Sequence, residues 1–123
     1  MDIFNNDKFY QGFEGEPEVI FQLLDDNNIS VHVWDGYISD MMTNQPGTDD
    51  DYRLGLSRDW NTLQGPYADK AINLIDVDEY YNDLIRIENM QFEFEDTKEV
   101  YKLIMFFLKL AKDNNQKVEM IVD

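Results

Sequence analysis

The sequence predicts an α+β fold: a mainly antiparallel sheet with two principal helices packed on one face, in a single domain spanning residues 1–123. Three observations indicate this class. Short runs of alternating apolar and polar residues, typical of strands, are separated by segments with the apolar spacing of helices. Hydrophobic residues make up 43% of the chain and aromatic residues 14%, enough for a packed core. A chain of 123 residues also suits one domain.

The first third is predicted to form a strand, a helix and a second strand. The first strand covers residues 8–13, with Phe9 and Phe13 on one face. The segment Gly15-Glu16-Pro17-Glu18 opens the helix, because proline suits the first helical position and acidic residues favour a helix N-terminus. The helix core is formed by apolar residues at helical spacing, namely Val19, Ile20, Leu23 and Leu24. The second strand covers residues 29–34 and alternates between an apolar and a polar face.

The middle of the chain is predicted to be rich in loops. Residues 35–51 are polar and contain turn-forming sequences, so they are expected to form a long loop. A strand is expected over residues 52–57 and an ordered loop over residues 58–70. A strand over residues 71–76 and a short helix over residues 78–84 follow, with Asp76 or Asp78 as the helix cap.

The last third has the clearest pattern. Residues 90–94 alternate as a half-buried strand, and Asp96 followed by Glu99 resembles a capping box at the start of a helix. That helix runs to about Asp113, with a broad apolar face in which Leu103 and Phe107 are core residues. Residues 118–122 form a closing strand.

The net charge narrows the possible partners. The chain has 26 acidic and 10 basic residues, a formal charge of −16 and a pI near 4.1. Such a surface repels nucleic acid and anionic lipid, so we expect no direct nucleic-acid binding and no membrane binding. A basic protein is the partner that this charge favours.

The chain is expected to be a soluble, cytoplasmic protein. It contains no cysteine, which excludes disulfides, thiol nucleophiles and thiolate metal sites. The first residues lack the basic and apolar regions of a secretory signal, and the longest apolar stretch, residues 103–108, is far too short to span a membrane.

The sequence carries little that suggests catalysis, and we expect no enzyme activity. His32, the single histidine, is expected to be a partly exposed or hydrogen-bonded strand residue. Gly55 precedes Ser57 by two residues, as in a nucleophile elbow, but Asp59 stands where that motif has its second glycine. Glycine-rich phosphate loops are absent.

No cofactor or metal is expected. The run Asp49-Asp50-Asp51 offers oxygen ligands to a hard cation such as Ca²⁺ or Mg²⁺, but it lacks the spacing of a calcium loop. A solvated loop, or one that meets basic side chains of a partner, is the simpler interpretation. The run from Asp76 to Glu79 is interpreted as helix capping.

Partner binding is instead expected from aromatic residues ringed by acids. Tryptophan and tyrosine dominate interface hot spots, and here they lie at strand ends or in the two long loops. The predicted partner-binding residues are Trp34, Asp35, Tyr37, Asp40, Asp49, Asp50, Asp51, Asp59, Trp60 and Tyr67. The sheet face that bears Glu93 and Glu95 is the next surface to consider.

A small, acidic, cysteine-free α+β protein with acids beside loop aromatics resembles in type the immunity proteins of bacterial toxin systems. The resemblance implies a protein that neutralises a cognate toxin by covering its basic site. The unit from Phe9 to Trp34, with its predicted helix followed by Asn28-Ile29 and a strand, is also similar to small bacterial signal-transducing domains. That second resemblance covers about a quarter of the chain.

These observations lead to one expected function and two alternatives. The expected function is an acidic binding protein that neutralises a basic partner, such as an immunity protein blocking a cognate nuclease toxin. The alternatives are a nucleic-acid-mimicking inhibitor of a DNA-binding protein and a small regulatory or signal-transducing binding module. A neighbouring toxin gene would favour the first, and a phage or mobile-element setting would favour the mimic.

Overall fold

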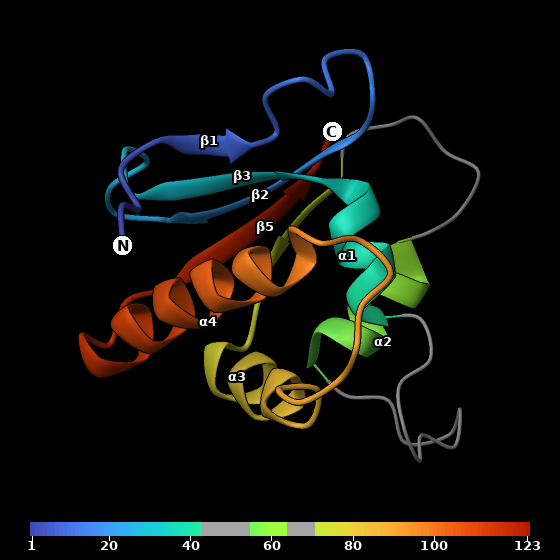
Figure 1. Cartoon of the computed structure of the whole chain (residues 1–123). Coiled ribbons are helices and arrows are strands. Elements are labelled where there is room, and N and C mark those ends of the chain that lie inside the picture. Colours follow the sequence, from blue (N-terminus) through green and yellow to red (C-terminus); the bar gives the residue numbers. More distant parts are fainter. Residues whose placement is uncertain (43–54, 64–70) are drawn as a thin grey trace.

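The sheet and its helices form two layers. The computed structural model describes residues 1–42, 55–63 and 71–123 (Figure 1). The strands of the described sheet lie in the order β1-β3-β2-β5-β4. Their bounds are β1 Asn6–Phe9, β2 Glu18–Leu23, β3 Ser30–Trp34, β4 Ala71–Leu74 and β5 Val118–Val122. The described helices are α1 Asp35–Met42, α2 Gly55–Leu63, α3 Val77–Ile85 and α4 Thr97–Asp113. They lie on one side of the sheet, so the predicted α+β class is confirmed (Figure 1).

The sheet is mixed but mostly antiparallel. Strand β2 lies at its centre and pairs antiparallel with β3 on one side and β5 on the other. Strand β4 continues the antiparallel pattern beside β5, whereas β1 runs parallel to β3 at the opposite edge. The predicted strands near residues 29–34, 71–76 and 118–122 are therefore confirmed. The first strand covers Asn6–Phe9 and shares only residues 8 and 9 with the predicted strand 8–13, so that prediction is wrong over residues 10–13, which form a turn and irregular backbone.

The helix predicted to begin at residues 15–18 is wrong, because this segment is the central strand β2. Its residues Val19, Ile20 and Phe21 form a continuous apolar run, and all three are buried. A short apolar run fits both a helix face and a strand covered on both sides, so the spacing alone does not separate them. Along the chain, β1, β2 and β3 therefore follow one another as three strands with no helix between them. The similarity to signal-transducing domains depended on that helix.

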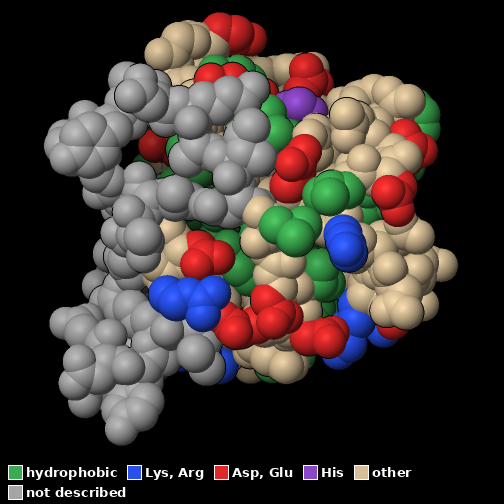
Figure 2. Space-filling model, turned by 180° about the vertical axis from the view of Figure 1, so that it is seen from behind, with side chains coloured by type: hydrophobic (Ala, Val, Ile, Leu, Met, Phe, Trp, Pro, Cys, Tyr) green, Lys and Arg blue, Asp and Glu red, His purple; other side chains and the backbone are tan. Residues whose placement is uncertain are grey.

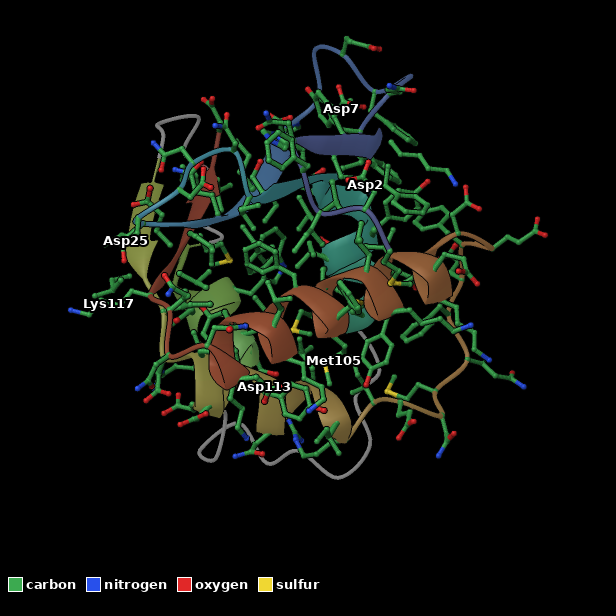
Figure 3. The ribbon with its side chains drawn as sticks, turned by 90° about the vertical axis from the view of Figure 1, so that its left-hand side faces the viewer. Asp2, Asp7, Asp25, Met105, Asp113 and Lys117 are labelled. Carbon is green, nitrogen blue, oxygen red and sulfur yellow. The ribbon has the colours of Figure 1, made fainter. Side chains whose placement is uncertain are left out.

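The main core lies between the sheet and helix α4. Val31 and Val33 of β3 point into it, and Leu103 and Phe107 of α4 are buried there as predicted. Figure 3 shows the side chains that fill the space between this helix and the sheet. Helices α1 and α4 contact the sheet, whereas α3 packs against α4 and α2.

Two of the predicted helix starts are confirmed, and their caps differ. Helix α3 is capped by Asp76, whose side chain accepts a hydrogen bond from the Glu79 N–H at 3.0 Å. Helix α4 follows Asp96, but the Asp96 side chain makes no capping hydrogen bond, so the capping box is not formed. Thr97 at the start of α4 instead donates its hydroxyl to Asp40.

Two helices stand where loops and a strand were predicted. Residues 35–42 of the predicted loop form α1, which buries Tyr37, Ile38 and Met41. Residues 55–63, divided between a predicted strand and a predicted loop, form α2. The spacing of the buried Leu56 and Trp60 is the helical signal in this stretch. The rest of the predicted segments 35–51, 52–57 and 58–70 lies outside the described residues.

The N–H groups at the start of helix α2 donate to side chains of α3, which explains why the sequence of α2 shows no cap. Glu79 accepts a hydrogen bond from the Gly55 N–H at 2.7 Å. Asp83 accepts from both the N–H and the hydroxyl of Ser57, at 2.9 and 2.8 Å. The carboxylates one turn apart on α3 therefore satisfy the first amides of α2, an interaction that sequence spacing does not reveal.

The strand predicted over residues 90–94 is also wrong. These residues lie in an irregular segment between α3 and α4. Met90 and Phe92 are partly buried against the core, which accounts for the alternating pattern without any pairing to the sheet. No helix in the described part of the chain is long and apolar enough to cross a membrane.

Candidate functional site

Five of the described aromatic side chains gather at one end of the molecule, where β3 leads into α1. We call the cluster of Phe9, Phe13, Trp34, Tyr37 and Phe94 the aromatic corner. Phe13 stacks on Trp34 with ring centroids 4.3 Å apart, and Phe94 lies 5.3 Å from Trp34 on another side. Tyr37 contacts Phe9, Phe13, Trp34 and Phe94 edge-on. Phe9, Phe13 and Phe94 thus meet around one tyrosine and one tryptophan.

Gly36 allows the Trp34 ring to lie directly on the first turn of α1. A Cβ atom at position 36 would lie 2.2–2.4 Å from three carbons of the six-membered ring of Trp34. That separation is far inside van der Waals contact. With Phe13 stacked at 4.3 Å, the ring has little freedom to move away. The position therefore requires glycine for packing.

Replacing Gly36 by alanine is expected to lower the free energy of unfolding by about 1–3 kcal/mol, the usual cost of overpacking. Chemical denaturation would measure the loss, and tryptophan emission would report the displaced ring. The matched control is the same substitution in a Trp34→Leu background, where the clash is relieved and the loss should shrink. Equal losses in both backgrounds would show that the Trp34 contact is not the cause.

Asp40 holds the irregular segment before α4 in place. Its carboxylate accepts hydrogen bonds from the N–H groups of Glu93 and Phe94, both at 2.9 Å, and from the Thr97 hydroxyl. One α1 side chain thereby fixes the backbone that presents Phe94, which is 39% exposed. The aromatic corner is consequently a rigid surface feature.

The surroundings of the aromatic corner are acidic. The pKa of Asp35 is raised, mainly by burial and then by the negative charge of Glu16. The pKa of Tyr37 is raised by burial and by its interaction with Asp96. Glu93 and Glu95 flank Phe94 and are exposed. Lys8 and Lys98 are the nearby bases, each lining a neighbouring hollow.

Three hollows open around the aromatic corner. One of about 300 Å³ is lined by Trp34, Gly36, Ser39, Asp40, Gln91, Glu93 and Phe94. A second, of about 320 Å³, lies on the other side of Phe94 and includes Glu95 and Lys98. A third, of about 340 Å³, includes Phe9, Phe13 and Tyr37 with Lys8. Each is small enough to receive a side chain rather than a large cofactor.

The structure brings together four of the predicted partner-binding residues. Trp34, Asp35, Tyr37 and Asp40 lie within or beside the aromatic corner. Tyr37 is buried, however, and Asp40 is engaged in the backbone contacts described above, so both act first in packing. Phe9, Phe13 and Phe94 were missed as members of the corner, because only their contacts with Trp34 and Tyr37, which lie far away in the sequence, mark them.

The remaining predicted residues lie elsewhere. Trp60 is 3% exposed and belongs to the core, so its indole is not presented to a partner in the described structure. Asp59 accepts a hydrogen bond from the Tyr80 hydroxyl and pairs with Arg58 at 3.1 Å. Asp49, Asp50, Asp51 and Tyr67 lie outside the described residues.

His32 lies in a hydrogen-bonded row on the sheet face opposite the helices. Its Nδ1 lies 3.2 Å from a Glu18 carboxylate oxygen, and its Nε2 lies 3.1 Å from the Ser30 hydroxyl. This Ser-His-Glu order resembles a catalytic triad. Ser30 is only 1% exposed, however, and its hydroxyl donates to Asn5. The row therefore joins strands and does not present a nucleophile, in keeping with the hydrogen-bonded strand residue predicted for His32.

The other polar groups considered from the sequence also have structural contacts. The Ser57 hydroxyl donates to the buried Asp83 carboxylate, which also pairs with Arg86. Among the described residues, no group of three or more His, Asp or Glu is placed to hold a metal ion. The run Asp49-Asp50-Asp51 is not part of that description.

Carboxylates are also widespread away from the aromatic corner. Figure 2 shows the opposite side of the molecule from Figure 1, with Asp and Glu side chains spread over its described part. Comparisons with known protein families, with curated proteins and with solved structures gave no match.

Proposed function

We propose that this chain is an acidic binding protein that covers a basic surface of a protein partner, as an immunity protein covers the site of a toxin. The observation that supports this most is the aromatic corner, a rigid aromatic cluster with an acidic rim on a chain of charge −16. Rigid aromatics supply contact area at low entropic cost, and the carboxylates steer a basic partner toward them. Binding of this kind needs no chemistry from the chain.

The exposed aromatic of this surface is Phe94, flanked by Glu93 and Glu95. Phe94 takes the anchor role that was predicted for Trp60, because Trp60 is buried. Trp34 supports Phe94, with the two ring centroids 5.3 Å apart. The fixed backbone of residues 93 and 94 keeps the anchor and its carboxylates in one orientation before binding. Such preorganisation lowers the cost of association.

We expect the chain to capture a toxin domain from its native host at low salt, and the test is association with that toxin domain, measured by stopped-flow at several salt concentrations. The variant Glu93→Lys/Glu95→Lys changes the net charge from −16 to −12, since each substitution adds two positive charges. It is expected to lower the association rate constant about tenfold at low salt, and less as salt rises. Protection of cells that express the toxin domain provides the functional readout.

The matched control is Asp25→Lys/Glu88→Lys, which gives the same net charge of −12 from two exposed sites away from the aromatic corner. It should slow association much less. Equal slowing by both pairs would mean that total charge, not this surface, drives the encounter. No capture of a toxin domain, together with displacement of a DNA-binding protein from DNA, would favour the nucleic-acid mimic.

A further inference from the structure

The hollow between Trp34 and Glu93 differs from its two neighbours in charge. It is lined by the carboxylates of Asp40 and Glu93 and by no basic residue. The hollow on the other side of Phe94 contains Lys98 together with Glu95, and the one beside Phe13 contains Lys8 together with Asp96 and Glu99. The first hollow is thus the one of the three in which no basic side chain competes with an incoming cation for the carboxylates.

The lining of this hollow suits a guanidinium group. Phe94 supplies a partly exposed aromatic ring, against which a planar cation can pack. Glu93 is exposed, and the described residues offer its carboxylate no ion pair. Asp40 accepts one hydrogen bond on Oδ1 and two on Oδ2, so Oδ1 retains capacity for another donor.

We propose that this hollow receives an arginine side chain of the basic partner. The inference rests on the proposed function and names the group that the aromatic corner recognises. An arginine is favoured over a lysine because its fork can donate to two carboxylates at once and its plane stacks on aromatic rings. A volume of about 300 Å³ lies at the lower limit of small-molecule sites, which fits one side chain.

The experiment uses the whole chain and N-acetyl-arginine amide as the probe, followed by ¹⁵N–¹H NMR at physiological salt. We expect saturable shifts of the Trp34 indole N–H and the Phe94 amide, with Trp60 in the core unaffected. N-acetyl-citrulline amide, which has nearly the same shape without the charge, should produce no saturable shift. Blocked lysine should bind at least about threefold more weakly than blocked arginine.

Glu93→Gln should weaken binding of the arginine probe about fivefold or more, because it removes the exposed carboxylate of the rim. The matched control is Glu88→Gln, which loses the same charge from a different hollow, between α3 and α4. Shifts that do not saturate, an equal response to citrulline, or an equal effect of the two substitutions would each overturn the assignment.

These readouts do not depend on a protein partner. If the toxin domain bound normally to Glu93→Gln while the arginine probe failed to bind the unaltered chain, the hollow would be excluded and the proposed function would stand. If the probe bound as expected but no basic protein did, the proposed function would fail separately.

Discussion

Phe107→Ala is expected to lower the free energy of unfolding by about 3–5 kcal/mol, a large part of the stability of a small domain. The Phe107 side chain is fully buried, on the face of α4 that packs under the sheet. Its removal leaves a cavity that the surrounding strands and helices fill only partly, since the backbone of both layers is held by hydrogen bonds. Urea denaturation followed by circular dichroism would measure the loss.

The neighbouring Phe106 provides the control, because it has the same side chain on the same helix but is 40% exposed. Phe106→Ala should cost about 1 kcal/mol or less, since a large part of its side chain already contacts water and its removal leaves no enclosed cavity. Similar losses for the two substitutions, or a loss below about 1 kcal/mol for Phe107→Ala, would contradict the orientation assigned to α4.

Asp83→Ala is expected to destabilise the protein by about 3 kcal/mol, although it removes only a small polar group. The Ser57 N–H and hydroxyl would both lose the charged acceptor that they share, and α2 would lose the anion at its N-terminus. Arg86 would lose its carboxylate partner as well. Thermal unfolding and hydrogen exchange within α2 would report the global and local effects.

Asp78→Ala is the comparison on the same helix. The Asp78 side chain is exposed and forms a surface pair with Lys112 at 3.7 Å, an interaction expected to contribute less than about 1 kcal/mol. A double-mutant cycle between Ser57→Ala and Asp83→Ala should show coupling, since the two side chains share one hydrogen bond. Additive effects would mean that Asp83 stabilises the fold through the Ser57 N–H and Arg86, and not through the Ser57 hydroxyl.

The sequence predicted the elements whose pattern is local and unambiguous. Helix α4 has 17 residues with one apolar face, and β3 alternates strictly, so each was recognisable alone. Strand β2 was mistaken for a helix because its apolar run fits either period. Helix α1 was missed because Asp35-Gly36 suggests a turn, whereas Gly36 is required there by its contact with the Trp34 ring. Helix α2 was missed because the alternation over residues 52–57 suggests a strand, whereas the N–H group of Gly55 at the start of α2 is bound by Glu79 of α3.

The residues of the candidate site were likewise predictable only where they lie close together in the sequence. Trp34, Asp35, Tyr37 and Asp40 were predicted together because they lie within seven consecutive residues, at a strand end. Phe13 and Phe94 approach Trp34 from segments about 20 and 60 residues away, and the pattern of each segment is equally consistent with an ordinary core position. The burial of Trp60 likewise depends on tertiary packing and not on its own segment.

The central position of β2 has a consequence for synthesis on the ribosome. Along one of its two edges β2 pairs with β5, and the cross-strand partners Gln22 and Glu119 are 97 residues apart in the sequence. At about 5–20 residues per second, the apolar segment around Phe21 waits roughly 5–20 s for its neighbour to be translated. During that interval an aggregation-prone strand edge is open to other nascent chains. The high negative charge, which keeps such chains apart, therefore also protects the protein before it can fold.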